Sequence, residues 1–107
     1  MSNRKILWTG SSGEKYEYLI YEIDTSFKNK PSNYIFAKET SPKEWLPVYI
    51  GETDLLADRL SNHEKLPCVK RNGGTHIHVH ISSSDEEIRR SEEVDLIEKW
   101  DPPCNKE

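Results

Sequence analysis

Two residues at helical spacing form the first pattern in this sequence that could do chemistry. Arg59 and His63 lie four positions apart in a segment predicted to be helical, so their side chains would project from one face. Tyr49, Ile50 and Gly51 come shortly before them and end a run that predicts a strand. A phenol, a guanidinium and an imidazole would therefore meet at one strand–helix corner. The alternative interpretation is an ordinary surface Arg–His pair.

A carboxylate in a late helical segment is the second such feature. With about 100° between successive residues, Glu93 shares a face with Leu96 and Trp100, which predicts that it faces the core. A carboxylate there needs a compensating charge, because burying an unpaired charge is costly. Either an arginine one turn back or a divalent cation could supply that charge. Glu92 is expected to point away, so that Glu92→Ala would be nearly neutral.

The order and spacing of these residues resemble the GIY-YIG endonuclease superfamily. The stretch from Val48 to Lys65, VYIGETDLLADRLSNHEK, is similar to the second half of the family signature followed by its arginine and histidine. The stretch from Glu93 to Asn105, EVDLIEKWDPPCN, resembles the glutamate-bearing helix and terminal asparagine, in the version of the bacterial excision-repair nuclease. Two such motifs in the right order make the resemblance specific, and it covers residues 32 to 105.

The first half of the signature is where this sequence departs from the family, which has Gly-Ile-Tyr on its first strand. Leu19-Ile20-Tyr21 has the closer letters, but its tyrosine lies much further from Tyr49 along the chain. Ser32-Asn33-Tyr34 is nearer, and its strand can pair with Val48 to Gly51 as a hairpin. We therefore expect Tyr34 to take the family position, without the family glycine before it.

The resemblance implies metal-dependent hydrolysis of phosphodiester bonds, with DNA as the expected substrate. Arg59 would bind phosphoryl oxygens through its charged fork. Glu93 would hold Mg²⁺ or Mn²⁺, since a single carboxylate suits these hard cations better than Zn²⁺. Tyr34, Tyr49 or His63 would accept the proton of the attacking water. The sequence does not choose among these three, because an unperturbed phenol is a weak base at neutral pH.

Further contacts to substrate are expected from the turn after the tyrosine strand and from a basic loop. Asn105 would orient a neighbour or a phosphate by hydrogen bonds, or else serve only as a turn or cap. The residues expected to contact substrate are Gly51, Lys65, Lys70 and Arg71.

Three histidines alternate along the segment THIHVHIS. His76, His78 and His80 would share one face of a strand, but they span about 13 Å and cannot all meet one ion. A zinc site that includes Cys68 or Cys104 is therefore the less favoured interpretation. The expected one is the wet face of an antiparallel sheet. A third is a face that flanks the catalytic groove and touches substrate phosphates.

These residues must be positioned by an α+β domain with a small, mostly antiparallel sheet flanked by helices. Residues 1–31 are expected to form an N-terminal extension with one added strand, and residues 32–107 the GIY-YIG-like core of one compact domain. Strands are predicted at 16–23, 33–38, 48–51 and 75–82, and helices at 53–64 and 84–100.

Composition limits the class of protein and of partner. The chain has 107 residues, and three Trp, five Tyr and two Phe argue against disorder. No apolar run approaches the roughly 20 residues of a membrane span, and the first residues are too polar for a secretory signal. We therefore expect a cytoplasmic protein without membrane contact, with Cys68 and Cys104 as reduced thiols.

The formal charge of −4 argues against strong unassisted binding to nucleic acid. Targeting would then depend on a protein partner or a homodimer. The same charge and the lost family glycine motivate an alternative function, a catalytically inactive binding module with this fold. A structural protein built on a zinc site is the third hypothesis.

Overall fold

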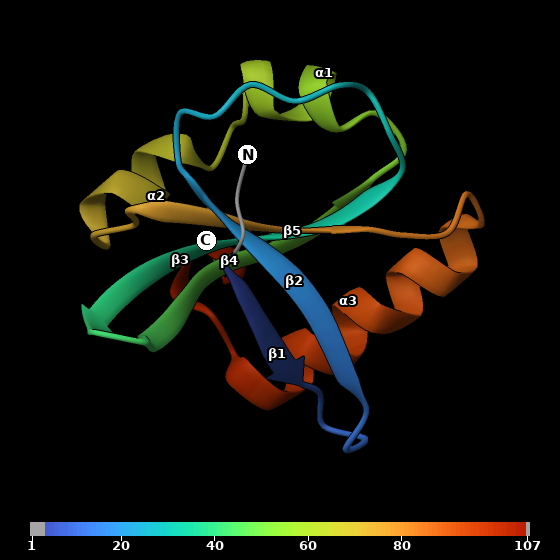
Figure 1. Ribbon diagram of the computed structural model, residues 1–107, viewed down its shortest axis with the longest axis horizontal. Helices are drawn as coiled ribbons and strands as arrows, with labels where there is room; N and C mark the ends of the chain where they lie inside the picture. The colour runs from blue at the N-terminus through green and yellow to red at the C-terminus, as the bar shows by residue number, and fades with distance from the viewer. Residues whose placement is uncertain (1–3, 107) are drawn as a thin grey trace.

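The computed structural model describes residues 4–106. An antiparallel five-stranded sheet curls into a half-barrel, with one long C-terminal helix and short helices around it (Figure 1). The α+β class and the antiparallel sheet expected from the sequence are therefore confirmed. The elements are β1 (Lys5–Thr9), β2 (Lys15–Glu22), β3 (Ser32–Ser41), β4 (Glu44–Thr53), α1 (Leu56–Ser61), α2 (Leu66–Arg71), β5 (His76–Ile81), α3 (Glu86–Trp100) and a 3₁₀ turn at Pro103–Asn105.

The strand order is β1-β2-β5-β3-β4, so that the last strand in the sequence lies at the centre of the sheet. β3 and β4 form the expected hairpin, in which Tyr34 lies opposite Gly51. Tyr21 lies on β2 instead, opposite Ile77 of β5. The pairing register therefore brings Tyr34, and not Tyr21, beside the strand that carries Tyr49.

Both faces of the sheet are buried, because alternate residues on each strand point to opposite sides. The first core lies under α1 and α2 and contains Tyr34, Phe36, Val48, Leu56, Cys68, Val69, Ile77, Val79 and Cys104. The second core lies against α3 and contains Trp8, Tyr18, Ile20, Ile35, Ala37, Trp45, Ile50 and Leu96. Trp45 of β4 packs inward.

The N-terminal segment contributes two strands, where the sequence predicted one. β1 pairs antiparallel with β2, and its Trp8 is buried in the second core. The sequence KILWT is short and begins with a lysine, so that its periodicity is too weak to predict a strand. Tertiary packing of the Trp8 ring against Trp100 of α3, with the ring centres 5.1 Å apart, stabilises it instead.

The region between β4 and β5 also differs from the prediction of one helix followed by a loop. α1 ends at Ser61, whose hydroxyl donates to the carbonyl of Asp58 and so competes with the helical hydrogen bonds. α2 then forms where a loop was expected. Pro67 lies in its first turn, where a missing N–H costs nothing, so that this proline begins a helix and does not close the segment.

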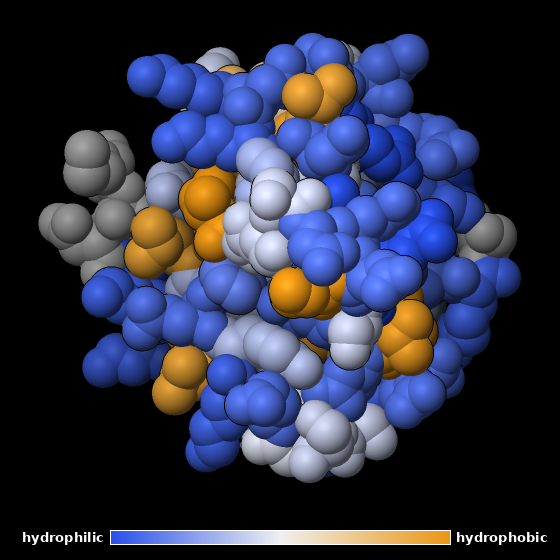
Figure 2. All heavy atoms as spheres, turned by 90° about the vertical axis from the view of Figure 1, so that its right-hand side faces the viewer, coloured by the Kyte–Doolittle hydropathy of each residue, from blue (hydrophilic) through white to orange (hydrophobic). Residues whose placement is uncertain are grey.

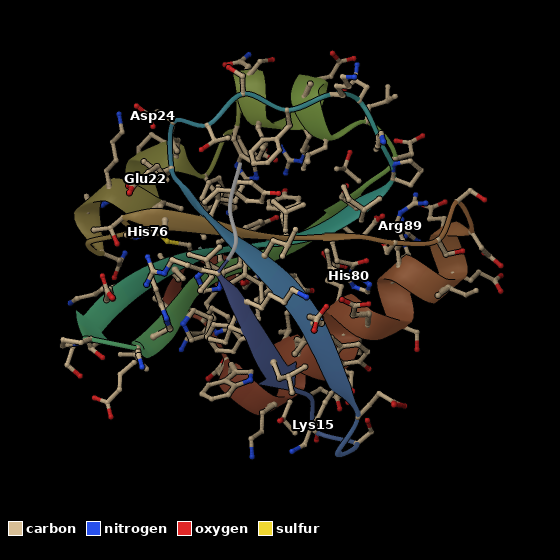
Figure 3. All side chains as sticks on the ribbon, viewed as in Figure 1. Lys15, Glu22, Asp24, His76, His80 and Arg89 are labelled. Atoms are coloured by element: carbon tan, nitrogen blue, oxygen red, sulfur yellow. A yellow bond between two sulfur atoms is a disulfide. The ribbon has the colours of Figure 1, made fainter. Side chains whose placement is uncertain are left out.

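The histidine face of β5 is not wet, which corrects the expectation for His76, His78 and His80. β5 is a central strand, and Trp45 covers this face, with its ring centre 4.8 Å from His76 and 4.7 Å from His78. His78 is fully buried and accepts a hydrogen bond of 2.9 Å from the indole of Trp8. His76 lies at one end of the strand and His80 nearer α3 (Figure 3).

Cys68 and Cys104 form a disulfide, so the expectation of reduced thiols was wrong. The bond joins α2 to the turn after α3, and Asn72 donates to the Cys68 carbonyl beside it. Sequence spacing could not predict the bond because the fold, not the chain, brings the two Cα atoms to 5.9 Å. Disulfides are rare in the cytosol. Reduced thiols were one argument for a cytoplasmic location, so that location stays a prediction without this argument.

The outer surface is mostly hydrophilic. Figure 2 shows the face at the right of Figure 1, where hydrophobic side chains lie in separate spots among polar ones. In the part of the chain from residue 4 to 106, no helix is both long and apolar enough to cross a membrane.

The disulfide generates a stability prediction. It closes a loop with a sequence separation of 36 residues, and removing such a constraint should lower the free energy of unfolding by about 3–4 kcal/mol. Chemical denaturation with and without a dithiol reductant measures the difference. Cys68→Ala/Cys104→Ala is the control and should not respond to reductant. Equal stability of the wild-type protein in both conditions would contradict the prediction.

Candidate active site

The candidate active site begins at a hydrogen bond between two buried side chains. The Tyr34 hydroxyl on β3 lies 2.7 Å from Nε2 of His63, in the segment between α1 and α2. Gly51 makes this approach available, because a Cβ atom there would lie 2.6 Å from the Tyr34 hydroxyl and 2.9 Å from the Tyr49 ring. Gly51, two residues after Tyr49, therefore leaves room for the Tyr34 side chain.

The protonation state of His63 follows from its contacts. Its Nδ1 accepts a hydrogen bond of 3.1 Å from the backbone N–H of Lys65. A neutral ring therefore carries its proton on Nε2 and donates it to the Tyr34 oxygen. Burial, and then the nearby Arg59 charge, lower the pKa of His63 to about 4, which keeps the ring neutral at pH 7. In this state Nε2 has no lone pair with which to take a proton from Tyr34.

Tyr49 and Arg59 form the more accessible part of the site. The Tyr49 ring is half-buried and packs 6.2 Å from the Tyr34 ring and 5.1 Å from His63. Burial raises the pKa of Tyr49 above its ordinary value. The Arg59 guanidinium, which hydrogen bonds to this phenol, offsets part of that rise. Arg59 is also paired with the exposed Glu64 at 3.2 Å.

Glu93 approaches the same site from α3. It is half-buried, and its carboxylate accepts a hydrogen bond from the backbone of Glu52, the residue after Gly51 on β4. Burial and the Glu52 charge raise the pKa of Glu93 to about 7, although Arg90 and Arg59 act in the opposite direction. A carboxyl group held in this way lacks full compensation for its charge when it ionises.

Glu92 does not point to solvent, which corrects the expectation that it is a neutral neighbour of Glu93. It is buried, it accepts a hydrogen bond of 2.6 Å from Tyr18, and it lies 2.9 Å from Nδ1 of His80. This hydrogen bond to Glu92 raises the pKa of His80. The β1–β2 extension supplies Tyr18, so the helical periodicity of α3 alone could not reveal this contact. Glu92→Ala is now expected to destabilise the fold.

Asn105 belongs to the architecture of the site and not to its open surface. Its side-chain oxygen accepts from the N–H of Ile50 at 2.8 Å, and its amide donates to the carbonyl of the same residue at 2.9 Å. Both groups are therefore used on the β4 backbone, between Tyr49 and Gly51. Of the three roles considered from the sequence, orienting a neighbour fits these contacts, whereas binding a phosphate and serving only as a turn or cap do not.

The basic residues expected to bind substrate are divided by the fold. Lys65 lies next to the site, since its backbone contacts His63 and its charge lowers the pKa of that ring. Lys70 and Arg71 lie in the last turn of α2, and Lys70 lines a different hollow beside the β2–β3 loop. The structure therefore brings together five of the predicted residues: Tyr34, Tyr49, Arg59, His63 and Glu93. Gly51, Lys65 and Asn105 lie beside these five and support them.

Sequence reasoning missed Glu52 near the site and gave Arg89 a different partner, since Arg89 or Arg90 was one expected partner of Glu93. Glu52 accepts a hydrogen bond of 2.9 Å from the nearly buried Arg89, and this pair fixes the N-terminal half of α3 against β4. Arg89 also donates to the carbonyl of Ser83. The spacing of Arg89 one turn before Glu93 indicated an ion pair between these two residues. The arginine pairs with Glu52 instead and leaves the charge of Glu93 partly uncompensated.

A hard divalent cation fits this donor set. Within residues 4–106, no three His, Cys, Asp or Glu side chains come together to hold a metal ion. A fully enclosed zinc or calcium site is therefore not built here. Mg²⁺ and Mn²⁺ keep several waters and need few protein ligands, so Glu93 with its raised pKa is a suitable single carboxylate.

Comparison with known proteins adds no relative. No protein-family model, curated protein or solved structure matches the chain.

The raised pKa of Glu93 predicts a pH dependence of stability. The folded protein holds this proton up to about pH 7, whereas the ordinary value is 4.5. At Glu93 the folded state therefore binds more protons than the unfolded state in this window, and the contribution of this group to stability falls as the pH rises through it. Glu93→Gln should remove this contribution, so that the stability of the wild type relative to Glu93→Gln falls from pH 4.5 to 7, and denaturation at several pH values measures the difference.

Glu98→Gln is the matched control, because Glu98 is exposed on the same helix. It should keep the wild-type pH dependence. If the stability of Glu93→Gln runs parallel to that of the wild type from pH 4 to 8, the carboxyl group has an ordinary pKa.

Proposed function

We propose that this chain is a metal-dependent endonuclease of the GIY-YIG type, which hydrolyses phosphodiester bonds, with DNA as the expected substrate. The observation that carries the proposal is the convergence of five side chains from separate segments of the sheet and helices. Two phenols, a guanidinium, a neutral imidazole and a poorly compensated carboxyl group meet around the β4 strand.

Arg59 is the residue suited to bind the phosphodiester. Its side chain is 28% exposed, and its partner Glu64 is 72% exposed, so a phosphate can replace that carboxylate at little cost. The planar guanidinium offers parallel donors to two phosphoryl oxygens. Its charge counters the negative charge that grows on those oxygens as water attacks phosphorus.

Tyr49 is the residue suited to accept the proton of the attacking water. Tyr34 is fully buried, and burial raises its pKa strongly, while His63 is neutral with its proton directed at Tyr34. Tyr49 is half-buried, and Arg59 favours its phenolate form. Tyr34 then acts as a positioning residue that holds the Tyr49 ring, and His63 holds Tyr34.

Glu93 would hold the divalent cation. When bound, the cation would act as a Lewis acid at the leaving oxygen. Its positive charge would also remove the burial penalty that raises the pKa of Glu93. Glu52 stays paired with Arg89 and contributes its backbone N–H to the Glu93 carboxylate.

A non-catalytic binding module is the second candidate function. The raised pKa of both Tyr34 and Tyr49 favours it, because a phenol with a raised pKa stays protonated at neutral pH and cannot accept the proton of water. The net charge of −4 also weakens turnover on a polyanion without a partner.

Cleavage of a panel of labelled DNA and RNA substrates with Mg²⁺ or Mn²⁺ tests the proposal. Arg59→Ala should lower kcat by about 100- to 1000-fold through loss of charge stabilisation. Tyr49→Phe should lower it by about 100-fold or more through loss of the general base, and Tyr34→Phe should lower it less. Glu93→Gln should abolish the response to divalent cation.

Tyr16→Phe and Glu98→Gln are the matched controls, because each makes the same chemical change outside the site. Both should keep wild-type turnover. If Arg59→Ala and Glu93→Gln both cleave the substrate as fast as the wild type does, this assignment is overturned. No cleavage of any substrate by the wild type would favour the binding module.

A further inference from the structure

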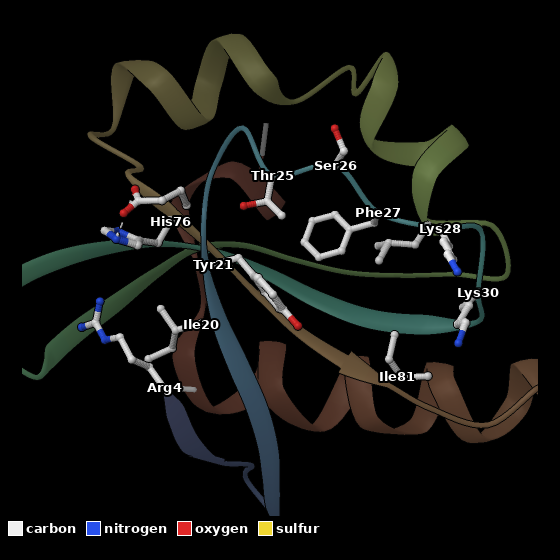
Figure 4. Close-up of a pocket in the computed structure, with 12 residues that line it drawn as sticks. Arg4, Ile20, Tyr21, Thr25, Ser26, Phe27, Lys28, Lys30, His76 and Ile81 are labelled. Carbon is white, nitrogen blue, oxygen red and sulfur yellow. Dashed lines mark ion pairs between the residues drawn. The ribbon is translucent and has the colours of Figure 1, made fainter. Parts of the chain in front are cut away.

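A hollow of about 770 Å³ lies outside the candidate active site, beside β2 and the loop that joins β2 to β3 (Figure 4). We call it the β2 groove. Its volume is within the range of sites that bind small molecules or single nucleotides. Tyr34, Tyr49, Arg59, His63 and Glu93 do not line it.

Two aromatic rings form the centre of the β2 groove. Tyr21 projects from β2 and Phe27 from the loop, with the ring centres 5.0 Å apart and the planes at 87°. Ile81 adds an apolar side chain that is 53% exposed. The part of each half-buried ring that lines the groove offers apolar aromatic surface to a planar group.

The charges around the β2 groove are mainly positive. Lys28 and Lys30 lie at one end and Arg4 at the other (Figure 4). Among the described residues, neither lysine forms an ion pair, and Arg4 contacts Glu39 at 3.6 Å. Glu22 is the only carboxylate of the described lining, and it faces His76 at 3.6 Å. A chain of net charge −4 therefore carries a local cationic groove.

The loop wall of the β2 groove is fixed by hydrogen bonds. Asn29 donates to Asp58 at 3.1 Å and accepts from the backbone N–H of the same residue at 2.9 Å. The carbonyl of Lys30 accepts from Leu56 of α1, and that of Pro31 accepts from Ser82 after β5. The groove is therefore preformed, and its wall is joined to α1, the helix that carries Arg59.

We propose that the β2 groove binds an unpaired segment of the nucleic-acid substrate, an inference that rests on the proposed nuclease function. A base stacks on the ring of Phe27 with its edge against the perpendicular ring of Tyr21, and the adjoining phosphates lie against Lys28 and Lys30. Stacked bases of an intact duplex do not offer their faces, so the groove selects a single-stranded segment. An acidic peptide would use the lysines but would leave the two rings without a planar partner.

Binding of a fluorescein-labelled oligothymidylate, followed by anisotropy in EDTA, tests this proposal. Lys28→Glu/Lys30→Glu should weaken binding at least about tenfold and reduce its salt dependence, since phosphate contacts are lost. Phe27→Leu keeps an apolar side chain but removes the ring, and should weaken binding about fivefold. An abasic oligonucleotide should bind the wild type and Phe27→Leu equally.

Lys15→Glu/Lys99→Glu is the matched control, because it makes the same change in net charge at exposed positions outside the groove. It should bind nearly as the wild type does at an ionic strength that screens distant charges. Equal weakening by the two lysine pairs would overturn the proposal, as would an unchanged affinity of Phe27→Leu. Displacement of the oligonucleotide by oligoglutamate at equal charge would also overturn it.

The binding assay contains no divalent cation, so its result is independent of turnover. If the protein cleaves its substrate but the groove variants bind the oligonucleotide as tightly as the wild type does, the proposal for the β2 groove is overturned and the nuclease proposal stands. Groove-dependent binding without cleavage of any substrate would overturn the nuclease and support the groove.

Discussion

The hydrogen bond between Tyr34 and His63 is the contact on which the organisation of the site depends. It joins the β3–β4 hairpin to the segment between α1 and α2, deep in the first core. A buried hydroxyl or imidazole left without this partner would cost about 1–3 kcal/mol. The bond therefore fixes the C-terminal end of α1 over the sheet, and with it the place of Arg59 beside Tyr49. Gly51 is the residue that makes this contact sterically available.

Two further constraints hold the tyrosine strand. Asn105 forms a pair of hydrogen bonds with the backbone of Ile50, and the adjacent Cys104 is covalently joined to α2. Glu52, one residue beyond Gly51, is paired with Arg89 of α3. The polar groups of β4 are thus held from the C-terminal turn and from α3. Rigid support of this kind keeps reacting groups in place before a substrate binds.

The hairpin could be predicted because strand alternation around Tyr34 and Tyr49 is a local signal. The grouping of Arg59, His63 and Glu93 with these tyrosines joins distant segments, and it was predicted from the resemblance of the two motifs and not from local periodicity. The errors at β1, the histidine face, Glu92 and the cysteines have one physical origin, which is contact between segments distant in the chain. β1 brings Trp8 to His78, β2 brings Tyr18 to Glu92, and α2 brings Cys68 to Cys104. None of these partners lies within one helical turn or one hairpin of the other.

The central claim is that Glu93 holds a divalent cation next to Tyr49 and Arg59, and that these groups act on one phosphodiester. A crystal of the protein grown with Mn²⁺ tests this most directly, through the anomalous scattering of the metal. The account predicts an anomalous peak within coordination distance of the Glu93 carboxylate, on the side that faces Tyr49, and no such peak in Glu93→Gln. A peak at another site, or no peak at Glu93 in crystals of a protein that cleaves its substrate with Mn²⁺, would contradict it.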